Sequence, residues 1–436
     1  MKKLFLLVCF LTVCLCDMKA QTLKYYTEII QLRPNRYDAI ASVYMYDYQS
    51  FFYDLYIPYY YKADRNYRVT SVAKRGFEDC TNMRSVDMPE SIVEIKERGF
   101  MGCVSLPYVK IPSNVHTIGN QAFYQCFHLA DVSLSDSLRT IGSYAFAYCI
   151  NLANVVFPDS LREVEQSAFA GCSALTSITF NTTMKTIRKN TFQNCTSLSS
   201  VDIPYSVGTI EEYAFKGCTG LRKVIFPRYL YEMKHHAFQN CTSLTDVVFP
   251  ESKTRLSLKD YLFEGCTGLT AINLPERIIY IGNGTFAGCT SLKSIVVPSS
   301  ANKIGNSAFS GCSGLTTVTI PETVKTIGDS AFYGCASLDS VYVSMAVPFT
   351  FGKETFAGIS PRCVLTVPDG KRDAYIAAGW TPQVFKGGVR EKSSPASIGK
   401  VKVQAKDDDW YDLNGSKVTQ PEKGRIYIHD GRKVLK

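Results

Sequence analysis

Apolar residues recur at a fixed interval over most of this 436-residue chain. Phenylalanine marks the interval, because thirteen phenylalanines follow one another at a spacing of 23 residues, with one spacing of 25 and one of 24. They are Phe77, Phe100, Phe123, Phe146, Phe169, Phe192, Phe215, Phe238, Phe263, Phe286, Phe309, Phe332 and Phe356. The twelve intervals carry apolar residues at the same places, so the chain is built from repeats.

Each repeat predicts one short strand. In all twelve intervals cysteine stands three residues after the phenylalanine, and leucine stands six after it, with Met83 as the exception. Valine or isoleucine follows at nine, an apolar residue at eleven, and proline at twelve in nine of the twelve intervals. This alternation is typical of a β-strand, and proline ends it because proline cannot donate to a ladder.

A second apolar segment, "I-G-x-x-A-F" in its commonest form, leads into the next phenylalanine and predicts a turn or short helical piece on the opposite side. One repeat cannot bury its own apolar face, whereas stacked repeats can. A period of 20–29 residues indicates a leucine-rich-repeat solenoid. We therefore predict a right-handed solenoid with a parallel β-sheet on its concave side and short turns or 3-10 pieces on its convex side, plus a small C-terminal β-hairpin unit.

The motif "I-G-x-x-A-F-x-x-C-x-x-L-x-x-V-x-I-P" resembles the 23-residue leucine-rich repeats of BspA-like bacterial surface proteins. The resemblance covers residues 69–358, which hold about twelve full repeats. Residues 55–77 resemble the irregular first repeat of that family, and residues 365–380 resemble its closing strand and helix. The resemblance implies a secreted or cell-surface, adhesin-like protein that binds host matrix proteins, glycans or other bacteria.

The segments around the repeats predict further parts. Residues 1–20 have the layout of a secretory signal peptide. Residues 21–68 hold twelve of the 27 tyrosines, which fits an N-terminal cap over the open core better than an aromatic platform for a sugar or peptide. Residues 359–385 are expected to form the C-terminal cap, and residues 386–406, rich in Gly, Ser and charge, a linker.

Residues 407–436 predict a small β tail, because short alternating segments are separated by "NG", "EKG" and "DG" turns. The tail resembles type IX secretion sorting segments, which implies delivery to the bacterial cell surface, outside the outer membrane, with the periplasm as the alternative location. The match is carried by Tyr411 to Gly415, Gly424, Tyr427, Ile428 and Gly431.

The net charge of +9 is concentrated at the ends of the chain. Residues 386–436 hold twelve basic and seven acidic residues, whereas residues 21–385 carry a net charge of only +2. A nucleic-acid-binding protein needs a basic stripe on its working face, so we expect no nucleic-acid partner. After residue 20 no segment is long and apolar enough to predict a transmembrane helix.

The sequence contains no recognisable set of catalytic or metal-binding residues. Its five histidines are scattered, and none stands at zinc spacing from cysteine or an acidic residue. Metalloprotease, P-loop, Rossmann and nucleophile-elbow motifs are absent. We therefore expect no catalysis, no cofactor and no metal, and a protein or glycan ligand as the partner.

Twelve equivalent cysteines, from Cys80 to Cys335, argue against any one of them being a nucleophile. Without residues 1–20 the chain keeps thirteen cysteines, an odd number for a complete disulfide framework. Side chains that run parallel into a core do not converge on a metal. We interpret the repeated cysteine as a small, soft, buried side chain that packs the turn before each strand.

We expect these thiols to be free. Alkylation of the denatured, unreduced protein should modify most of the twelve repeat cysteines, counted by mass spectrometry. Widespread protection from the reagent would instead show disulfides.

Partner binding is expected on the concave face, at the residues eight and ten positions after each phenylalanine, which should point outward. The candidates are Tyr108, Lys110, Val156, Asp202, Lys223, Ile225, Val248, Val296 and Tyr342. Their β-branched members fit either plain strand propensity or an apolar contact patch. A two-residue insertion within residues 251–262 is expected at the convex side or the edge. An envelope structural or scaffold protein that binds a component of its own cell is the alternative function.

Overall fold

The computed structural model describes residues 40–43, 54–57, 59–62, 66–252, 254–392, 410–411, 417–418, 426–429 and 432–435. The chain divides into two units, residues 1–391 and 392–436. The expected signal peptide lies outside the described residues, as does much of the tyrosine-rich segment.

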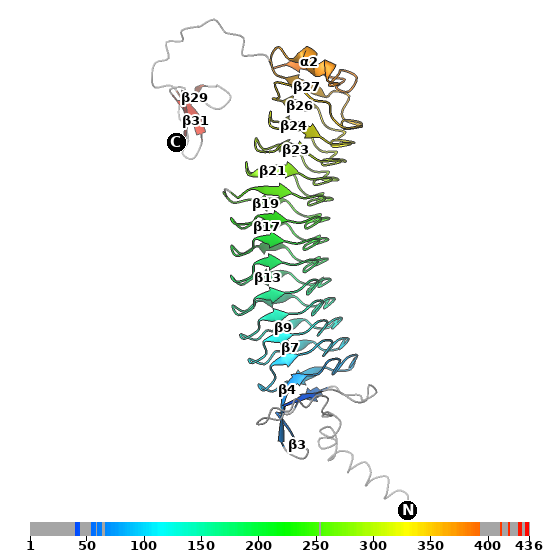
Figure 1. Ribbon diagram of the computed structural model, residues 1–436, viewed down its shortest axis with the longest axis vertical. Helices are drawn as coiled ribbons and strands as arrows, with labels where there is room; N and C mark the ends of the chain where they lie inside the picture. Colours follow the sequence, from blue (N-terminus) through cyan, green and yellow to red (C-terminus); the bar gives the residue numbers. More distant parts are fainter. Residues whose placement is uncertain are drawn as a thin grey trace, which may run out of the picture. The chain divides into compact units, whose positions relative to one another are not determined.

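The first unit is a stack of coils, and all but one of the described repeat coils contribute a short strand to a row of parallel strands (Figure 1). We call this row the first strand wall. The strands pair at a separation of one repeat within five groups, β2-β5, β7-β9, β11-β13, β15-β17-β19 and β22-β24-β26-β27-β28. In the fourth group Val201 lies beside Val224. The row comprises β2 (Asp54–Tyr56), β5 (Ser85–Asp87), β7 (Tyr108–Lys110), β9 (Asp131–Ser133), β11 (Asn154–Val156), β13 (Ser177–Thr179), β15 (Ser200–Asp202), β17 (Lys223–Ile225), β19 (Asp246–Val248), β22 (Ser294–Val296), β24 (Thr317–Ile320), β26 (Ser340–Val343), β27 (Val364–Val367) and β28 (Gly388–Glu391).

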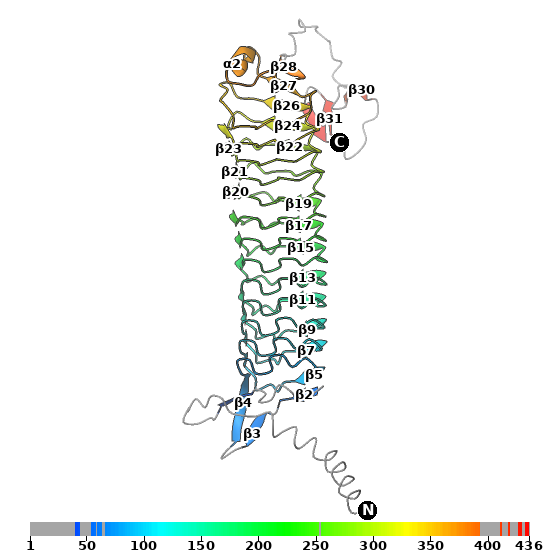
Figure 2. The same cartoon turned by 90° about the vertical axis from the view of Figure 1, so that its right-hand side faces the viewer.

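A second row of parallel strands runs along the opposite edge of the stack (Figure 2). The sequence pattern predicts only one strand per repeat, because two residues such as Thr186–Ile187 are too few to show alternation; their pairing arises only when coils stack. The row comprises β1 (Ile40–Val43), β4 (Asn66–Val72), β6 (Glu94–Ile95), β8 (Thr117–Ile118), β10 (Thr140–Ile141), β12 (Glu163–Val164), β14 (Thr186–Ile187), β16 (Thr209–Ile210), β18 (Glu232–Met233), β20 (Leu256–Leu258), β21 (Ile278–Ile281), β23 (Lys303–Ile304) and β25 (Thr326–Ile327).

The turns between the two rows hold a continuous stack of the repeat phenylalanines. Adjacent rings lie 5.1 to 5.8 Å apart, centroid to centroid, and are nearly parallel. Each ring is at most 4% exposed. Burial of so many aromatic side chains is a large share of the stabilisation of this unit.

Backbone hydrogen bonds join the turns of successive coils. In one coil the N–H groups of Tyr213, Phe215 and Gly217 donate to carbonyls of the next coil, at 2.8 to 3.3 Å. Tyr213 and Gly217 have positive φ angles, 59° and 72°. These two left-handed residues on either side of Phe215 turn all three N–H groups toward the next coil. Glycine is frequent at the Gly217 position because it adopts positive φ without steric cost.

Each buried repeat cysteine from Cys103 to Cys335 donates a hydrogen bond between coils. The Sγ atom of Cys241 lies 3.2 Å from the carbonyl oxygen of Phe215, which also accepts the N–H of Cys218. The same contact recurs at 3.0 to 3.3 Å along the stack. The cysteine is therefore a weak donor to the second lone pair of a buried carbonyl as well as a packing residue.

The C-terminal end of the stack is covered by aromatic side chains. Helix α2 (Arg372–Ala377) follows β27, and Tyr375, Trp380 and Phe385 are fully buried. The Tyr375 hydroxyl donates to the Met345 carbonyl at 2.8 Å. Residues 388–391, which the composition assigns to the linker, instead form β28 in parallel with β27. The predicted start of the linker at 386 is therefore wrong, because ladder pairing recruits these residues.

At the N-terminal end, β1 and β4 pair in parallel, and β3 (Tyr60–Lys62) forms an antiparallel hairpin with β4. The second unit is a small antiparallel sheet in the order β30-β29-β31-β32. Its strands are β29 (Trp410–Tyr411), β30 (Lys417–Val418), β31 (Ile426–His429) and β32 (Arg432–Leu435).

Candidate binding surface

The strands of the first wall expose alternate residues. In β15 and β17 the middle residues, Val201 and Val224, are at most 3% exposed, whereas the flanking residues point outward. Side chains of a strand alternate between its two faces, so one inward valine or isoleucine per strand leaves two outward positions. These positions form two parallel rows along the wall.

The structure places all nine candidate residues on this outward face. Eight of the nine are exposed. Among the apolar candidates Val156 and Val296 have the largest exposed fractions, 63% and 65%. Ile225 is only half-buried. The hydrophobic candidates therefore reach solvent and can contact a partner. Where such a residue stands alone, the preference of β-branched residues for strands is enough to explain its presence.

Four of the candidates lie together. Strand register places Ile225 between Asp202 on one side and Val248 on the other. Lys223, on the same strand, lies between Ser200 and Asp246 in the parallel row. We call Asp202, Lys223, Ile225 and Val248 the central cluster. It combines two β-branched side chains with one charge of each sign on a rigid sheet.

The other candidates lie outside the central cluster. Tyr108 and Lys110 are on β7 and Val156 is on β11, several coils away. On the other side, residues 271–273 form no strand, and this coil separates the cluster from Val296 and Tyr342. Four of the nine candidate residues therefore form one cluster, and the other five lie apart from it.

Two exposed tyrosines extend this region and are missed by the strand pattern. Tyr205 and Tyr229 are 64% and 62% exposed and follow β15 and β17 by a few residues. Tyr231, 59% exposed, directly precedes β18 of the second row. A Cβ atom on Gly208 would lie 2.3 Å from the Tyr231 ring, so this ring lies against the preceding coil. Comparing the residues that follow the repeat proline would have found Tyr205 and Tyr229, since other repeats mostly carry Ser, Thr, Asp or Glu there.

The described residues include no group of three or more metal-ligating side chains. In the same part of the chain, no helix has the length and apolar character needed to cross a bilayer. A surface of this kind, shallow and built from strand side chains and tyrosines, is suited to contact with another macromolecule.

The stacked coils define a leucine-rich-repeat solenoid, a class whose members generally bind proteins. The family model described as BspA type leucine rich repeat region, in six copies, matches residues 60–173, 139–259 and 256–365. The chain belongs to this family.

Of the three solved structures described next, the first has a TM-score above 0.5 and shows the same fold. A leucine-rich repeat protein from Bacteroides ovatus is 24% identical, with a TM-score of 0.54, over 79% of this chain and 98% of that one. A leucine rich cell surface protein from Faecalibacterium prausnitzii is 24% identical over 73% and 93% of the two chains, with a TM-score of 0.42. The pneumococcal vaccine antigen PcpA is 17% identical over 81% and 94%, with a TM-score of 0.47. No curated protein matches the chain.

Proposed function

We propose that this protein is a secreted or cell-surface binding protein, adhesin-like in role, whose first strand wall engages a host matrix protein, a glycan or another bacterium. The central cluster carries the proposal. Its two β-branched side chains lie side by side on adjacent coils, next to Asp202 and Lys223. Interfaces commonly have an apolar centre surrounded by a polar rim.

The exposed tyrosines support the same region. Tyr205 and Tyr229 each follow a strand of the central cluster by a few residues, and both are more than 60% exposed. Tyrosine supplies a large contact area together with a hydroxyl for hydrogen bonding, which is why it is enriched at interfaces. The rigid stack holds these rings at little cost in backbone entropy on binding.

The double variant Ile225→Asp/Val248→Asp should lose binding to its partner by at least tenfold, because two charges would be desolvated in an apolar contact. The measurement is saturable binding of the purified protein to a panel of matrix proteins, glycans and bacterial cells. Val347→Asp is the matched control, since Val347 is 81% exposed and lies outside the strand wall. Equal binding by the double variant and the control would contradict this assignment of the surface.

An envelope scaffold that binds a component of the same cell remains the alternative. Crosslinking in intact cells followed by co-purification distinguishes the two, because a scaffold would be recovered with an envelope component. Binding of an antibody to intact cells tests the surface location itself, and a protein that is reached only after the outer membrane is opened does not fit the adhesin role.

A further inference from the structure

The corner that follows the repeat proline is held in several coils by a side-chain hydrogen bond. In these coils a serine or threonine fourteen residues after the phenylalanine donates to a carbonyl of the preceding coil. Ser160 donates to the Leu138 carbonyl at 2.6 Å, and Thr323 donates to the Ala301 carbonyl at 2.8 Å. Most repeats carry serine or threonine at this position.

Arginine replaces the short side chain in the coil after the two-residue insertion. Arg277 occupies the serine position, and its Nη1 donates to the carbonyls of Thr254 and Leu230 at 3.2 and 3.0 Å. Leu230 lies 47 residues earlier in the chain, so the arginine spans the coil that holds the insertion. The irregular coil thus has a long donor where its neighbours have hydroxyls.

The Arg277 guanidinium retains unused donors. Arg277 is only 6% exposed, and its Nε and Nη2 atoms are buried with no hydrogen-bond partner in the described part of the chain. Burial lowers the pKa of this guanidinium, although arginine stays charged at neutral pH. An uncompensated buried charge is strongly unfavourable, so these two donors are suited to an anion.

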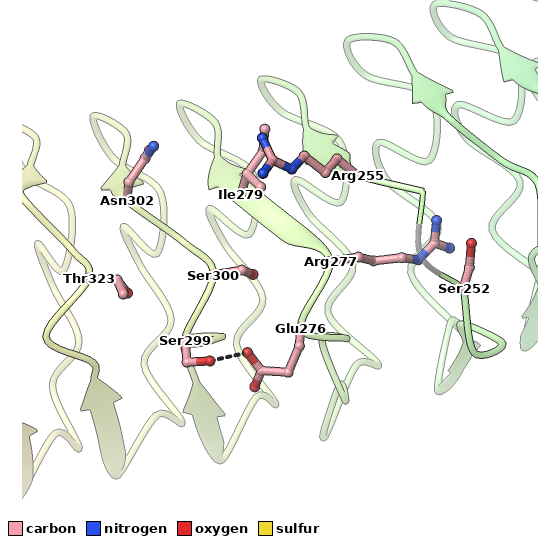
Figure 3. A pocket seen from close by; sticks show the side chains of 9 residues that line it. All are labelled: Ser252, Arg255, Glu276, Arg277, Ile279, Ser299, Ser300, Asn302 and Thr323. Atoms are coloured by element: carbon pink, nitrogen blue, oxygen red, sulfur yellow. Dashed lines mark hydrogen bonds between the residues drawn. The ribbon is translucent and has the colours of Figure 1, made fainter.

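A pocket of about 650 Å³ lies at this charge (Figure 3). Arg255, an exposed residue of the insertion coil, provides a second cation in its lining. The Glu276 carboxylate accepts the Ser299 hydroxyl at 2.5 Å and points away from the Arg277 guanidinium. The carboxylate keeps its negative charge at the far side of the pocket, and the two arginines outnumber it in the lining.

The remaining lining is made of small polar side chains. Ser252, Ser299, Ser300, Asn302 and Thr323 contribute hydroxyls and an amide, and among the described lining residues Ile279 is the one apolar side chain. The volume is within the range of small-ligand sites, about 300–1,000 Å³. Hydroxyl and amide groups pair with sugar hydroxyls, whereas a bound peptide would need the apolar or aromatic anchors that this lining lacks.

We propose that the pocket between Arg255 and Arg277 binds an anionic sugar, one that carries a carboxylate or a sulfate group. A rotation of the Arg277 side chain brings Nε and Nη2, which are buried in this structure, to the anionic group, and Arg255 adds charge at the rim. The Ser252 hydroxyl and the Asn302 amide donate to the sugar hydroxyls. Ser299, Ser300 and Thr323, whose hydroxyl hydrogens are donated within the protein, accept from them. This site lies at the corner of the coils, so it does not depend on the function proposed for the first strand wall.

Calorimetric titration of the full chain at constant ionic strength tests the proposal, with glucuronate, glucose 6-sulfate, glucose and sodium sulfate as the probes. We expect a charged sugar to bind at least tenfold more tightly than glucose and than sodium sulfate, and its affinity to fall as salt is raised. Arg255→Ala and Arg277→Lys should each weaken binding about tenfold or more. Arg255→Ala removes a nearby charge, and Arg277→Lys removes a charge-assisted hydrogen bond of the guanidinium.

Lys325→Ala is the matched control, because it removes an exposed cation of a neighbouring corner outside the pocket and should leave affinity within about twofold. Arg255 is exposed, so its variant keeps the test valid if Arg277→Lys fails to fold. Absence of charged-sugar binding, indifference to both arginine variants, equal binding of sodium sulfate, or preference for an oligoglutamate peptide would each overturn the proposal.

Discussion

Replacing Phe215 by alanine is expected to lower the free energy of unfolding by about 3–5 kcal/mol. The Phe215 ring is fully buried between Phe192 at 5.4 Å and Phe238 at 5.2 Å. Its removal opens a cavity on both sides of one coil, and each coil is stabilised by its two neighbours. Backbone bonds between coils limit how far the cavity can collapse. Denaturant unfolding followed by circular dichroism measures the change.

Phe127→Ala is the control for this prediction. Phe127 is 36% exposed, so its truncation should cost less than about 1.5 kcal/mol, the transfer term of a partly exposed side chain. If the two variants lost the same stability, the continuous phenylalanine stack would not be the main support of the coils. A change in the steepness of the Phe215→Ala transition would show that coils on either side unfold separately.

Raising the pH from 8 to 11 is expected to destabilise the solenoid strongly through its buried thiols. Burial raises the pKa of Cys172, Cys218 and Cys266 from 9.0 to about 12. Because the folded pKa is the higher one, the stabilisation is fully present below pH 9 and is lost as the pH rises toward 12. At pH 11 each such thiol should favour unfolding by roughly 2–3 kcal/mol. Denaturant unfolding at the two pH values measures the loss.

The variant Cys218→Ala isolates the thiol contribution, since tyrosine and lysine titrate alike in both proteins. The free energy of unfolding should fall less between pH 8 and pH 11 in this variant than in the unmodified protein. The difference should equal the contribution of one buried thiol, roughly 2–3 kcal/mol. Cys80→Ala serves as the control, because Cys80 is only partly buried and ends the row. An unchanged pH difference in Cys218→Ala would show that the thiol does not resist ionisation in the folded protein.

The sequence-based prediction of the fold holds because its main signal is local. Val201, Val224 and their equivalents stand at the same distance from each phenylalanine, and strand alternation then determines which neighbours point outward. The family resemblance is confirmed by the family match over residues 60–365. The small antiparallel tail agrees with the predicted β unit in its strands. Its resemblance to sorting segments stays a prediction.

The features that the sequence did not predict are contacts between neighbouring coils. Nothing within one repeat indicates that Thr186–Ile187 pairs with the next coil, or that Cys241 donates to Phe215, because both partners lie about one repeat away. The central cluster is recognisable only after register places Ile225 beside Val248. Arg277 could have been noticed as an arginine at a serine position, but its reach to Leu230 could not.

The amino-acid sequence by itself therefore determined the period, the first row of strands, the buried side chains and the outward rows, since each follows from spacing along the chain. Only the tertiary structure decided the second row of strands, the hydrogen-bonded thiols, the central cluster and the arginine pocket. Stacking brings residues 23 to 47 positions apart into contact, and at these contacts an irregular coil or a single substitution produces a site that the repeat pattern does not contain.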